Sequence, residues 1–339
     1  MEYRNVWELF PGIGCAWINA AGKTAAEYYG AADLESNAPV NRDTVFPACS
    51  VSKFITAICV MKLHEQGTVD IDRPANHYLR RWKLRSPDGS ESNASIRSIL
   101  CHTAGIVDGE DAFYGLRRND PEISLMDILE GKTTYNNRPV RSEKPQGEVF
   151  EYSDAGYCVL QQLLQEMMCP SFDGIVRDTL FNPLGLRSTF FAAPGSMAFY
   201  EPRMATGYDE AGLPIPGKFP SVPDLAASGL WSTPEELLII AREFMEAYKG
   251  RSSFLQQKTV LEMMKPAEKF PWAGPGLLIG ENDTLISRGW GENGQCILKM
   301  HCRTGEIAAV MTNRNPGVDQ HASGVEWLAD RGSYEDNQA

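Results

Sequence analysis

Length, composition and charge exclude several classes of protein before any motif is considered. The chain has 339 residues, and 32 Lys and Arg stand against 44 Asp and Glu, for a net charge of −12. This balance argues against a nucleic-acid-binding protein, which needs clustered basic side chains. No apolar run approaches the roughly 20 residues that span a bilayer. With 43% hydrophobic residues, we expect one large folded domain or two joined domains, and neither nucleic acid nor membrane as a partner.

The N-terminus and the cysteines favour a cytoplasmic protein. The first seven residues lack the basic and then apolar pattern of a secretory signal, although a chain trimmed of an export signal would look the same. None of the eight cysteines forms a C-x-x-C pair, and several lie in apolar runs. We therefore interpret them as buried thiols rather than as disulfides or zinc ligands, and we expect no metal.

The predicted elements place strands at both ends of the chain and helices between them. A hairpin is expected from residues 13–18 and 24–30, and a buried helix from residues 50–67. Further helices are predicted at residues 95–101, 125–130, 157–168, 234–248 and 319–330, and further strands at residues 276–280, 284–287, 295–301 and 306–312. This order predicts an α/β (α+β) protein, in which both termini build one antiparallel sheet, helices flank it and a helical subdomain is inserted.

Ser50 and Lys53 form the one S-x-x-K pattern in the chain. If a helix begins at Ser50, Lys53 lies one turn on and shares its face. A serine hydroxyl is a weak nucleophile that needs an adjacent base, and burial lowers the proton affinity of a lysine, which suits it to that role. A serine cap with a lysine in the first turn is the alternative. The helix is apolar on nearly every side, however, and this favours the catalytic interpretation.

Two further segments contain residues that suit the same chemistry. Tyr152 precedes a predicted helix, and beside Lys53 it could relay a proton to a leaving group; a packed tyrosine followed by a helix cap is the alternative. Residues 288–294 join two predicted strands and contain three glycines. Backbone N–H groups of such a strand could complete an oxyanion hole with the N–H of Ser50, although a plain hairpin turn has the same composition.

Other catalytic patterns are missing from the sequence. There is no G-x-S-x-G elbow, no phosphate-binding loop, no dinucleotide fingerprint and no H-E-x-x-H. His102 follows a predicted helix, and a structural histidine is a better interpretation than the base of a triad.

The order of the motifs resembles the serine β-lactamase and penicillin-binding protein superfamily, and most closely its branch of class C β-lactamases, DD-peptidases and esterases. The resemblance extends over nearly the whole chain. Residues 99–106 are similar to the family's LLxHTSG turn, residues 182–186 to its PLGM segment, and residues 227–233 to its GGLxST segment.

The resemblance implies an acyl-enzyme mechanism that needs no cofactor. Ser50 would be the acylated nucleophile, Lys53 its base partner and Tyr152 the second general acid and base. The resemblance also implies that the sheet domain is discontinuous, comprising residues 1–75 and 205–339. Residues 76–204 would form the mainly helical subdomain, with the active site between the two.

Two departures from the family pattern concern substrate recognition. The family's Tyr-x-Asn is Tyr152-Ser153-Asp154 here, and an ionised Asp154 would raise the pKa of a nearby Lys53 and favour a substrate that carries an amine. The third motif, usually Lys-Thr-Gly or His-x-Gly, has neither Lys nor His. Its register stays open, with substrate-binding or oxyanion roles expected for Arg288, Trp290, Gly291 and Glu292. A tryptophan at this place favours esters or neutral amides.

We therefore predict a serine hydrolase that acts on a small ester or amide through acyl-Ser50. The alternatives are a DD-peptidase or β-lactamase activity on a β-lactam-like substrate, acyl transfer through the same intermediate, and a catalytically silent binding or sensor homologue. The sequence does not indicate an oligomeric state.

Overall fold

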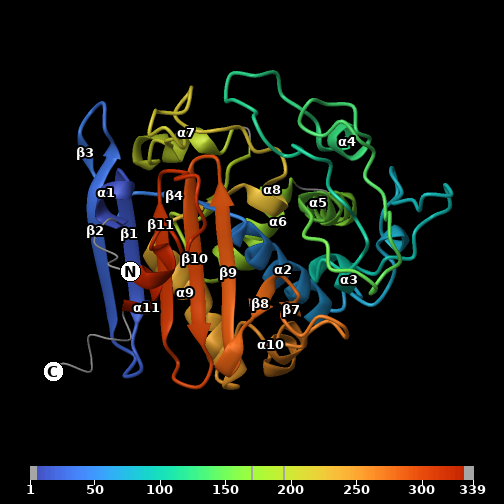
Figure 1. The fold of residues 1–339 in the computed structure, drawn as a ribbon. Coiled ribbons are helices and arrows are strands. Elements are labelled where there is room, and N and C mark those ends of the chain that lie inside the picture. The colour runs from blue at the N-terminus through green and yellow to red at the C-terminus, as the bar shows by residue number, and fades with distance from the viewer. Residues whose placement is uncertain (1–5, 169–170, 194, 332–339) are drawn as a thin grey trace.

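The computed structural model describes residues 6–168, 171–193 and 195–331. Within these residues eight strands form the main antiparallel sheet (Figure 1). Their order across the sheet is β3 (Ala38–Pro39), β2 (Thr24–Asp33), β1 (Gly12–Ile18), β11 (Ile307–Thr312), β10 (Gly294–His301), β9 (Thr284–Gly291), β8 (Leu277–Ile279) and β7 (Ala273–Gly274). The chain termini therefore supply neighbouring strands, as the sequence predicts.

A second sheet contains three short strands, in the order β4 (Phe46–Cys49), β6 (Leu230–Ser232) and β5 (Phe190–Phe191). The sequence analysis did not foresee this sheet. Its strands have two to four residues each, too few for an alternating pattern to stand out.

Helices cover both faces of the main sheet (Figure 1). The helices of the described residues are α1 (Val6–Leu9), α2 (Val51–Glu65), α3 (Ile96–Leu100), α4 (Leu125–Leu129), α5 (Asp154–Met168), α6 (Phe172–Val176), α7 (Met197–Tyr200), α8 (Leu225–Ser228), α9 (Pro234–Tyr248), α10 (Gln257–Met263) and α11 (Val325–Arg331). Short 3-10 or π turns occupy Ala75–His77, Arg177–Phe181, Glu201–Arg203 and Glu281–Asp283. Figure 1 shows α3, α4 and α5 grouped on the side of α2 away from the large strands.

The burial of β1 shows why its sequence is apolar throughout. Ile13 and Trp17 pack with α1 and α11 on one face of the sheet, whereas Ala16 and Ile18 belong to the core that contains α2 and α9. A central strand with both faces covered has no solvent side, so it shows a continuous apolar run rather than alternation.

The helix α2 is buried on almost every side, between the sheet and the helices α8 and α10. Gly276, just before β8, lies directly on its backbone, with φ +76°. A Cβ at that position would lie 2.3 Å from the Cβ of Ala57 and 3.0 Å from the carbonyl oxygen of Lys53. Close packing of this kind requires glycine and holds the β7–β8 segment against the start of α2.

The predicted fold class is confirmed, although several boundaries differ. The helix predicted at residues 157–168 begins at Asp154, and the strand predicted at residues 24–30 continues to Asp33. The strand predicted at residues 284–287 continues to Gly291, because β10 pairs with it along its whole length. The final helix begins at Val325 rather than near Asp319. The Asp319 side chain accepts a hydrogen bond from the Ala322 N–H and Gly324 has φ +85°, so the intervening residues form turns. No helix in the described ranges is long and apolar enough to cross a membrane.

Candidate active site

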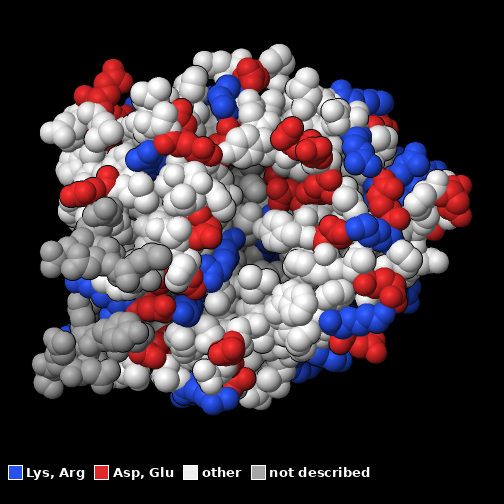
Figure 2. Space-filling model, in the orientation of Figure 1, with Lys and Arg blue, Asp and Glu red and all other residues white. Residues whose placement is uncertain are grey.

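A cavity of about 590 Å³ opens where β9, the start of α2 and the residues before α5 meet. Figure 2 shows this hollow near the centre of one face, with basic side chains inside it and acidic ones at its rim. Ser50, Lys53 and Tyr152 all line the cavity, so the structure brings together candidate residues that were predicted from two separate segments of the sequence.

Ser50 follows a strained residue at the end of β4. Cys49 has φ +48°, a left-handed conformation that is uncommon for a residue other than glycine. Its thiol is buried and donates a hydrogen bond to the Gly294 carbonyl at 3.5 Å. The side chain of Ser50 makes no helix-cap hydrogen bond, and its Oγ instead lies 3.2 Å from the Lys53 Nζ. The hydroxyl is therefore directed at the lysine and not at the helix backbone.

Two glycines let β9 run close to the nucleophile. A Cβ at Gly289 would lie 2.2 Å from the Ala48 carbonyl oxygen, and a Cβ at Gly291 would lie 3.0 Å from the Cys49 Sγ. In this stretch β8 pairs only with Leu285 and Ile286, so residues 288–291 extend beyond it, alongside the end of β4. This explains the glycine content of the segment, because side chains there would push the strand away from Ser50.

Lys53 is surrounded by acceptors from three different elements. Its ammonium donates to Ser50 Oγ, to Asp154 Oδ1 at 2.5 Å and to the Ala227 carbonyl at 3.1 Å, and its side chain is only 3% exposed. Its Nζ also lies 4.7 Å from the centre of the Tyr152 ring. A buried ammonium with all its protons used is well defined in position.

The charge state of Lys53 differs from the one that burial by itself would produce. Burial by itself lowers the pKa of Lys53, but the Asp154 carboxylate and the Tyr152 hydroxyl outweigh burial and raise that pKa above its ordinary value. Lys53 is therefore an ammonium at neutral pH, as the sequence analysis expected from Asp154. Asp154 does not line the cavity, and its carboxylate is bound to Lys53 rather than open to an amine of a substrate.

Tyr152 stands against the ring of His102, with ring centres 4.4 Å apart and 24° between the planes. Although about half of Tyr152 is exposed (49%), desolvation of its hydroxyl raises the pKa above the usual value for tyrosine, and Asp154 adds to this, whereas Lys53 and Ser50 oppose it. Tyr152 is consequently a neutral phenol at neutral pH, which is the form that can donate a proton.

His102 has the environment of a structural residue. It has φ +58°, and its Nδ1 accepts a hydrogen bond from the Ser153 N–H at 3.1 Å. Burial, with a further contribution from the charge of Lys53, lowers its pKa to about 3. The ring is neutral at physiological pH and supports Tyr152.

The sequence analysis missed two buried carboxyl groups near Lys53. Asp108 accepts hydrogen bonds from the Ser153 hydroxyl and the Asp154 N–H, and burial together with the charge of Asp154 raises its pKa to about 6. Asp224 accepts a hydrogen bond from the Tyr135 hydroxyl at 2.7 Å. Burial, with Asp154 nearby, raises the pKa of Asp224. Neither residue lies in a motif, and only packing of the loops onto α5 and α8 brings them near the site.

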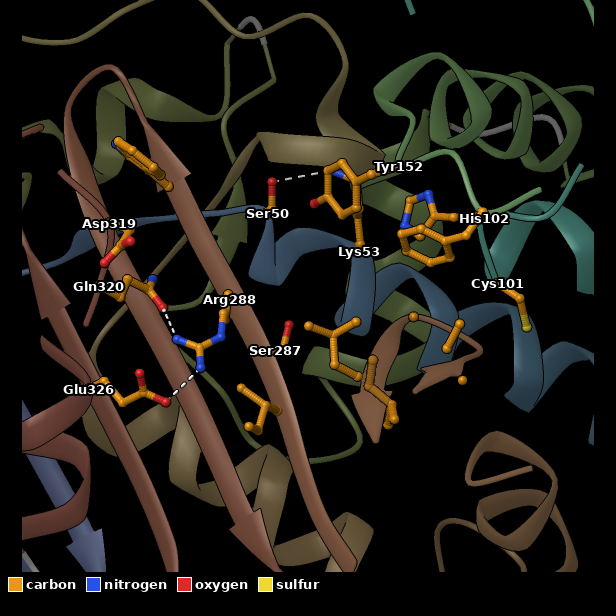
Figure 3. A pocket seen from close by; sticks show the side chains of 18 of the residues that line it. Ser50, Lys53, Cys101, His102, Tyr152, Ser287, Arg288, Asp319, Gln320 and Glu326 are labelled. Carbon is orange, nitrogen blue, oxygen red and sulfur yellow. Dashed lines mark hydrogen bonds and ion pairs between the residues drawn. The ribbon is translucent and has the colours of Figure 1, made fainter. Parts of the chain in front are cut away.

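The other end of the cavity holds Arg288 in a fixed arrangement (Figure 3). Its guanidinium donates to Gln320 at 3.2 Å and to Glu326 at 2.6 Å. Gln320 is itself buried and donates to the carbonyls of Gly289 and Cys296. Arg288 is thus a cation that faces the cavity and already has an anionic partner.

The remaining predicted residues of the third motif lie at different places. Trp290 lines the cavity, is 47% exposed and donates from its ring nitrogen to Asn315 at 2.8 Å. Glu292 is not among the cavity-lining residues. Its carboxylate binds Arg117 at 2.6 Å and accepts from the Gly115 N–H, so it ties the β9–β10 turn to the loop opposite.

Potential metal ligands and thiols complete the description of the site. Among the residues that the structure describes, no group of three or more His, Cys, Asp and Glu side chains could hold a metal ion. Seven cysteines are free and buried, whereas Cys169 lies outside the described residues.

The antiparallel sheet flanked by helices is the fold of solved penicillin-binding protein homologues and amidases. The sequence matches the Beta-lactamase family model over residues 8–331. The chain belongs to the Beta-lactamase family.

Known proteins similar to this chain include an esterase and an amidase. The chain is 25% identical over 332 residues to esterase EstB of Burkholderia gladioli, covering 88% of this chain and 75% of the esterase. Two further curated relatives are matched over only 25% and 38% of their own length.

Two solved structures show the same fold. The octameric penicillin-binding protein homologue from Pyrococcus abyssi has a TM-score of 0.77 and 21% identity, over 97% of this chain and 74% of the other. The D-amino acid amidase from Ochrobactrum anthropi has a TM-score of 0.76 and 23% identity, over 98% and 97%.

Proposed function

We propose that the protein hydrolyses a small ester or neutral amide through an acyl-enzyme formed on Ser50. The observation that carries this proposal is the contact of the Ser50 Oγ with the Lys53 Nζ at 3.2 Å, inside a cavity that Tyr152 also lines. Ser50 and Lys53 come from residues 1–75 and Tyr152 from residues 76–204, so the site would lie between the two domains inferred from the resemblance.

The geometry supports a definite route for the protons. Lys53 first gives one of its protons to Asp154 Oδ1, to which it is already bonded, and the neutral amine then accepts the Ser50 proton as Ser50 attacks the carbonyl carbon. Tyr152 donates its proton to the leaving oxygen or nitrogen and regains one from Lys53, which recovers its own proton from Asp154. This route uses the ammonium and the neutral phenol that the surroundings favour at neutral pH.

The oxyanion of the tetrahedral intermediate would lie between the N–H of Ser50 and the backbone of β9. The close approach of Gly289 and Gly291 to the end of β4 supports this role, since fixed N–H groups beside the reacting carbonyl stabilise the developing charge. Among the third-motif positions, Trp290 is the side chain that faces the substrate and does not carry charge.

Replacement of the nucleophile tests the proposal. Ser50→Ala is expected to lower the hydrolysis of p-nitrophenyl acetate roughly 10³-fold or more and to abolish covalent labelling by a fluorophosphonate probe, located by mass spectrometry. Ser253→Ala, at an exposed position, is the matched control and should behave as the wild type. Full activity and labelling in Ser50→Ala would refute the assignment.

A further inference from the structure

Ser50 lies between two sides of the cavity that differ in chemistry (Figure 3). Arg288, Gln320 and Glu326 lie on one side of it, and His102 and Cys101 lie on the other. Tyr152 belongs to the second side, because its ring is stacked on His102. The acyl group and the leaving group of a substrate, which meet at the scissile carbonyl, therefore face different surroundings.

The side that includes Tyr152 is lined by apolar side chains from three parts of the chain. They are Phe150, which adjoins His102, Cys101, and Ala273, Leu277 and Leu278 of the β7–β8 hairpin, whose Gly276 N–H donates to the Leu100 carbonyl. Ile286, opposite Leu278 in β9, packs against the cluster that α1 and α11 form and shares a strand face with Arg288, so it lies at the border with the charged side. The Phe150 ring packs against Phe270 and Trp272, with centres 6.1 Å and 6.3 Å away.

Apart from Lys53, whose charge is paired with Asp154, the titratable side chains on this side carry no charge at neutral pH. Burial lowers the pKa of His102 to about 3 and raises the pKa of the Cys101 thiol to about 12. Across Ser50, the side chains of Arg288, Glu326 and Asp319 all line the cavity. Placing an apolar ring against those charges would remove water from them at a cost in free energy. An apolar group of the substrate is therefore bound more favourably on the side of the cavity that includes Tyr152.

The position of Tyr152 shows which part of the substrate, the acyl group or the leaving group, lies on the apolar side. In the proposed mechanism Tyr152 protonates the leaving oxygen or nitrogen, and that atom must lie within hydrogen-bond reach of its hydroxyl. Phe150 is two residues away in the chain, and it lines the same side of the cavity. A substituent on the leaving atom therefore extends over the apolar side.

We infer that this apolar side, formed by Phe150, Leu278 and their neighbours, is a binding site for the leaving group. The preferred substrates are then esters or amides of an apolar alcohol or amine that carries an aromatic ring, joined to a small or polar acyl group. This inference rests on the proposed function and specifies its substrate class.

Two isomeric esters provide a matched test. In 2-phenylethyl acetate the ring is on the leaving alcohol, and in ethyl phenylacetate it is on the acyl group, whereas the size of the molecule is the same. The wild-type protein is expected to show a kcat/KM about tenfold higher for 2-phenylethyl acetate, because burial of an apolar ring contributes at least this factor.

Variants locate the preference on the apolar side. Phe150→Ala and Leu278→Ala are each expected to lower the ratio of kcat/KM for 2-phenylethyl acetate to that for ethyl acetate by about three- to tenfold. Phe199→Ala is the control, because this side chain is 75% exposed and lies outside the cavity lining. Its ratio should equal that of the wild type.

Each outcome has a defined meaning. Equal rates for the two isomers, a preference for ethyl phenylacetate, or an unchanged ratio in both variants overturns this inference while leaving the proposed function in place. If the wild type hydrolyses none of the esters and Ser50 is not labelled by the fluorophosphonate probe, the proposed function itself fails, and this inference fails with it.

Discussion

Two ion pairs in the same cavity differ in what they contribute. Lys53 and Asp154 join α2 to α5 at 2.5 Å, with side chains 3% and 23% exposed. Arg288 and Glu326 join β9 to α11 at 2.6 Å, with side chains 35% and 22% exposed. The distances are almost equal, but the Lys53 side chain is almost fully buried, whereas the Arg288 side chain is about one-third exposed to solvent.

The comparison shows that the contribution of an ion pair to stability depends on how deeply its cation is buried rather than on the pairing itself. A buried charge that loses its partner costs about 3–5 kcal/mol, because nothing replaces its lost hydration. A pair whose cation is about one-third exposed is screened by water and contributes about 1 kcal/mol or less. The Lys53 pair is also in contact with Ser50, whereas the Arg288 pair is not.

The largest effect is expected for Lys53→Met, which removes the buried cation but keeps an unbranched side chain. Hydrolysis of p-nitrophenyl acetate should fall roughly 10³-fold or more, because Ser50 loses its proton acceptor. The free energy of unfolding, measured in urea, should fall by about 3 kcal/mol, because Asp154 is left without a partner.

Lys258→Met is the control for this prediction, since Lys258 is exposed on α10. It should alter neither measurement. If Lys53→Met unfolds at the same urea concentration as the wild type, the contrast between the two ion pairs is wrong.

Asp154→Asn is expected to have the next largest effect, because it keeps the shape of the side chain and removes only the charge. In the wild type Asp154 accepts a proton from Lys53. In the variant Lys53 must instead lose a proton to solvent before it can act as the base. The rise of kcat/KM with pH should therefore occur at higher pH in the variant, with activity at pH 7 about 10- to 100-fold lower. An unchanged pH profile would refute the role of Asp154 as proton acceptor.

The stability of the same variant should depend on pH in a defined direction. In the wild type the folded pKa of Lys53 is raised, so its stabilising contribution is fully present below the unfolded value of about 10.4 and is lost only above it. Without Asp154, burial lowers the folded pKa, and the variant gains stability as pH rises toward about 10. The difference in Tm between wild type and variant should thus be largest near neutral pH and shrink in alkali. Asp178→Asn, at an exposed position, should show no such trend.

The smallest effect is expected for Glu326→Gln. The exposed pair contributes about 1 kcal/mol or less, so Tm should change by about 2 °C or less and added salt should reduce the difference further. A loss of about 3 kcal/mol, as expected for Lys53→Met, would show that the two pairs are equivalent.

Much of the fold and the centre of the site could be predicted from the sequence. The apolar helix after Ser50 and the strand patterns near both termini are strong local signals, because burial on both faces leaves few polar positions. The S-x-x-K spacing places Ser50 and Lys53 on one helix face by geometry alone. The association of Tyr152 with them was a hypothesis from the sequence that the family resemblance also implied, and the structure places its ring 4.7 Å from the Lys53 Nζ.

Other features carry no local signal. Asp108 and Asp224 look like ordinary polar residues in loops, and only packing onto α5 and α8 buries them and shifts their pKa values. Phe150 and Leu278 are far apart in the chain, and no periodic pattern indicates that they line the same side of the cavity. The very short strands of the second sheet escape detection for the same reason, since their pairing is entirely long-range.

The amino-acid sequence by itself determined the acidic composition, the order of strands and helices, and the presence of a serine and a lysine one helical turn apart. Only the tertiary structure decided that Asp154 contacts Lys53 and is its partner rather than a partner of the substrate, and that the cavity has one charged and one apolar side. The physical reason is that hydration and electrostatic fields depend on every group packed around an atom, and these groups come from segments that the sequence keeps far apart.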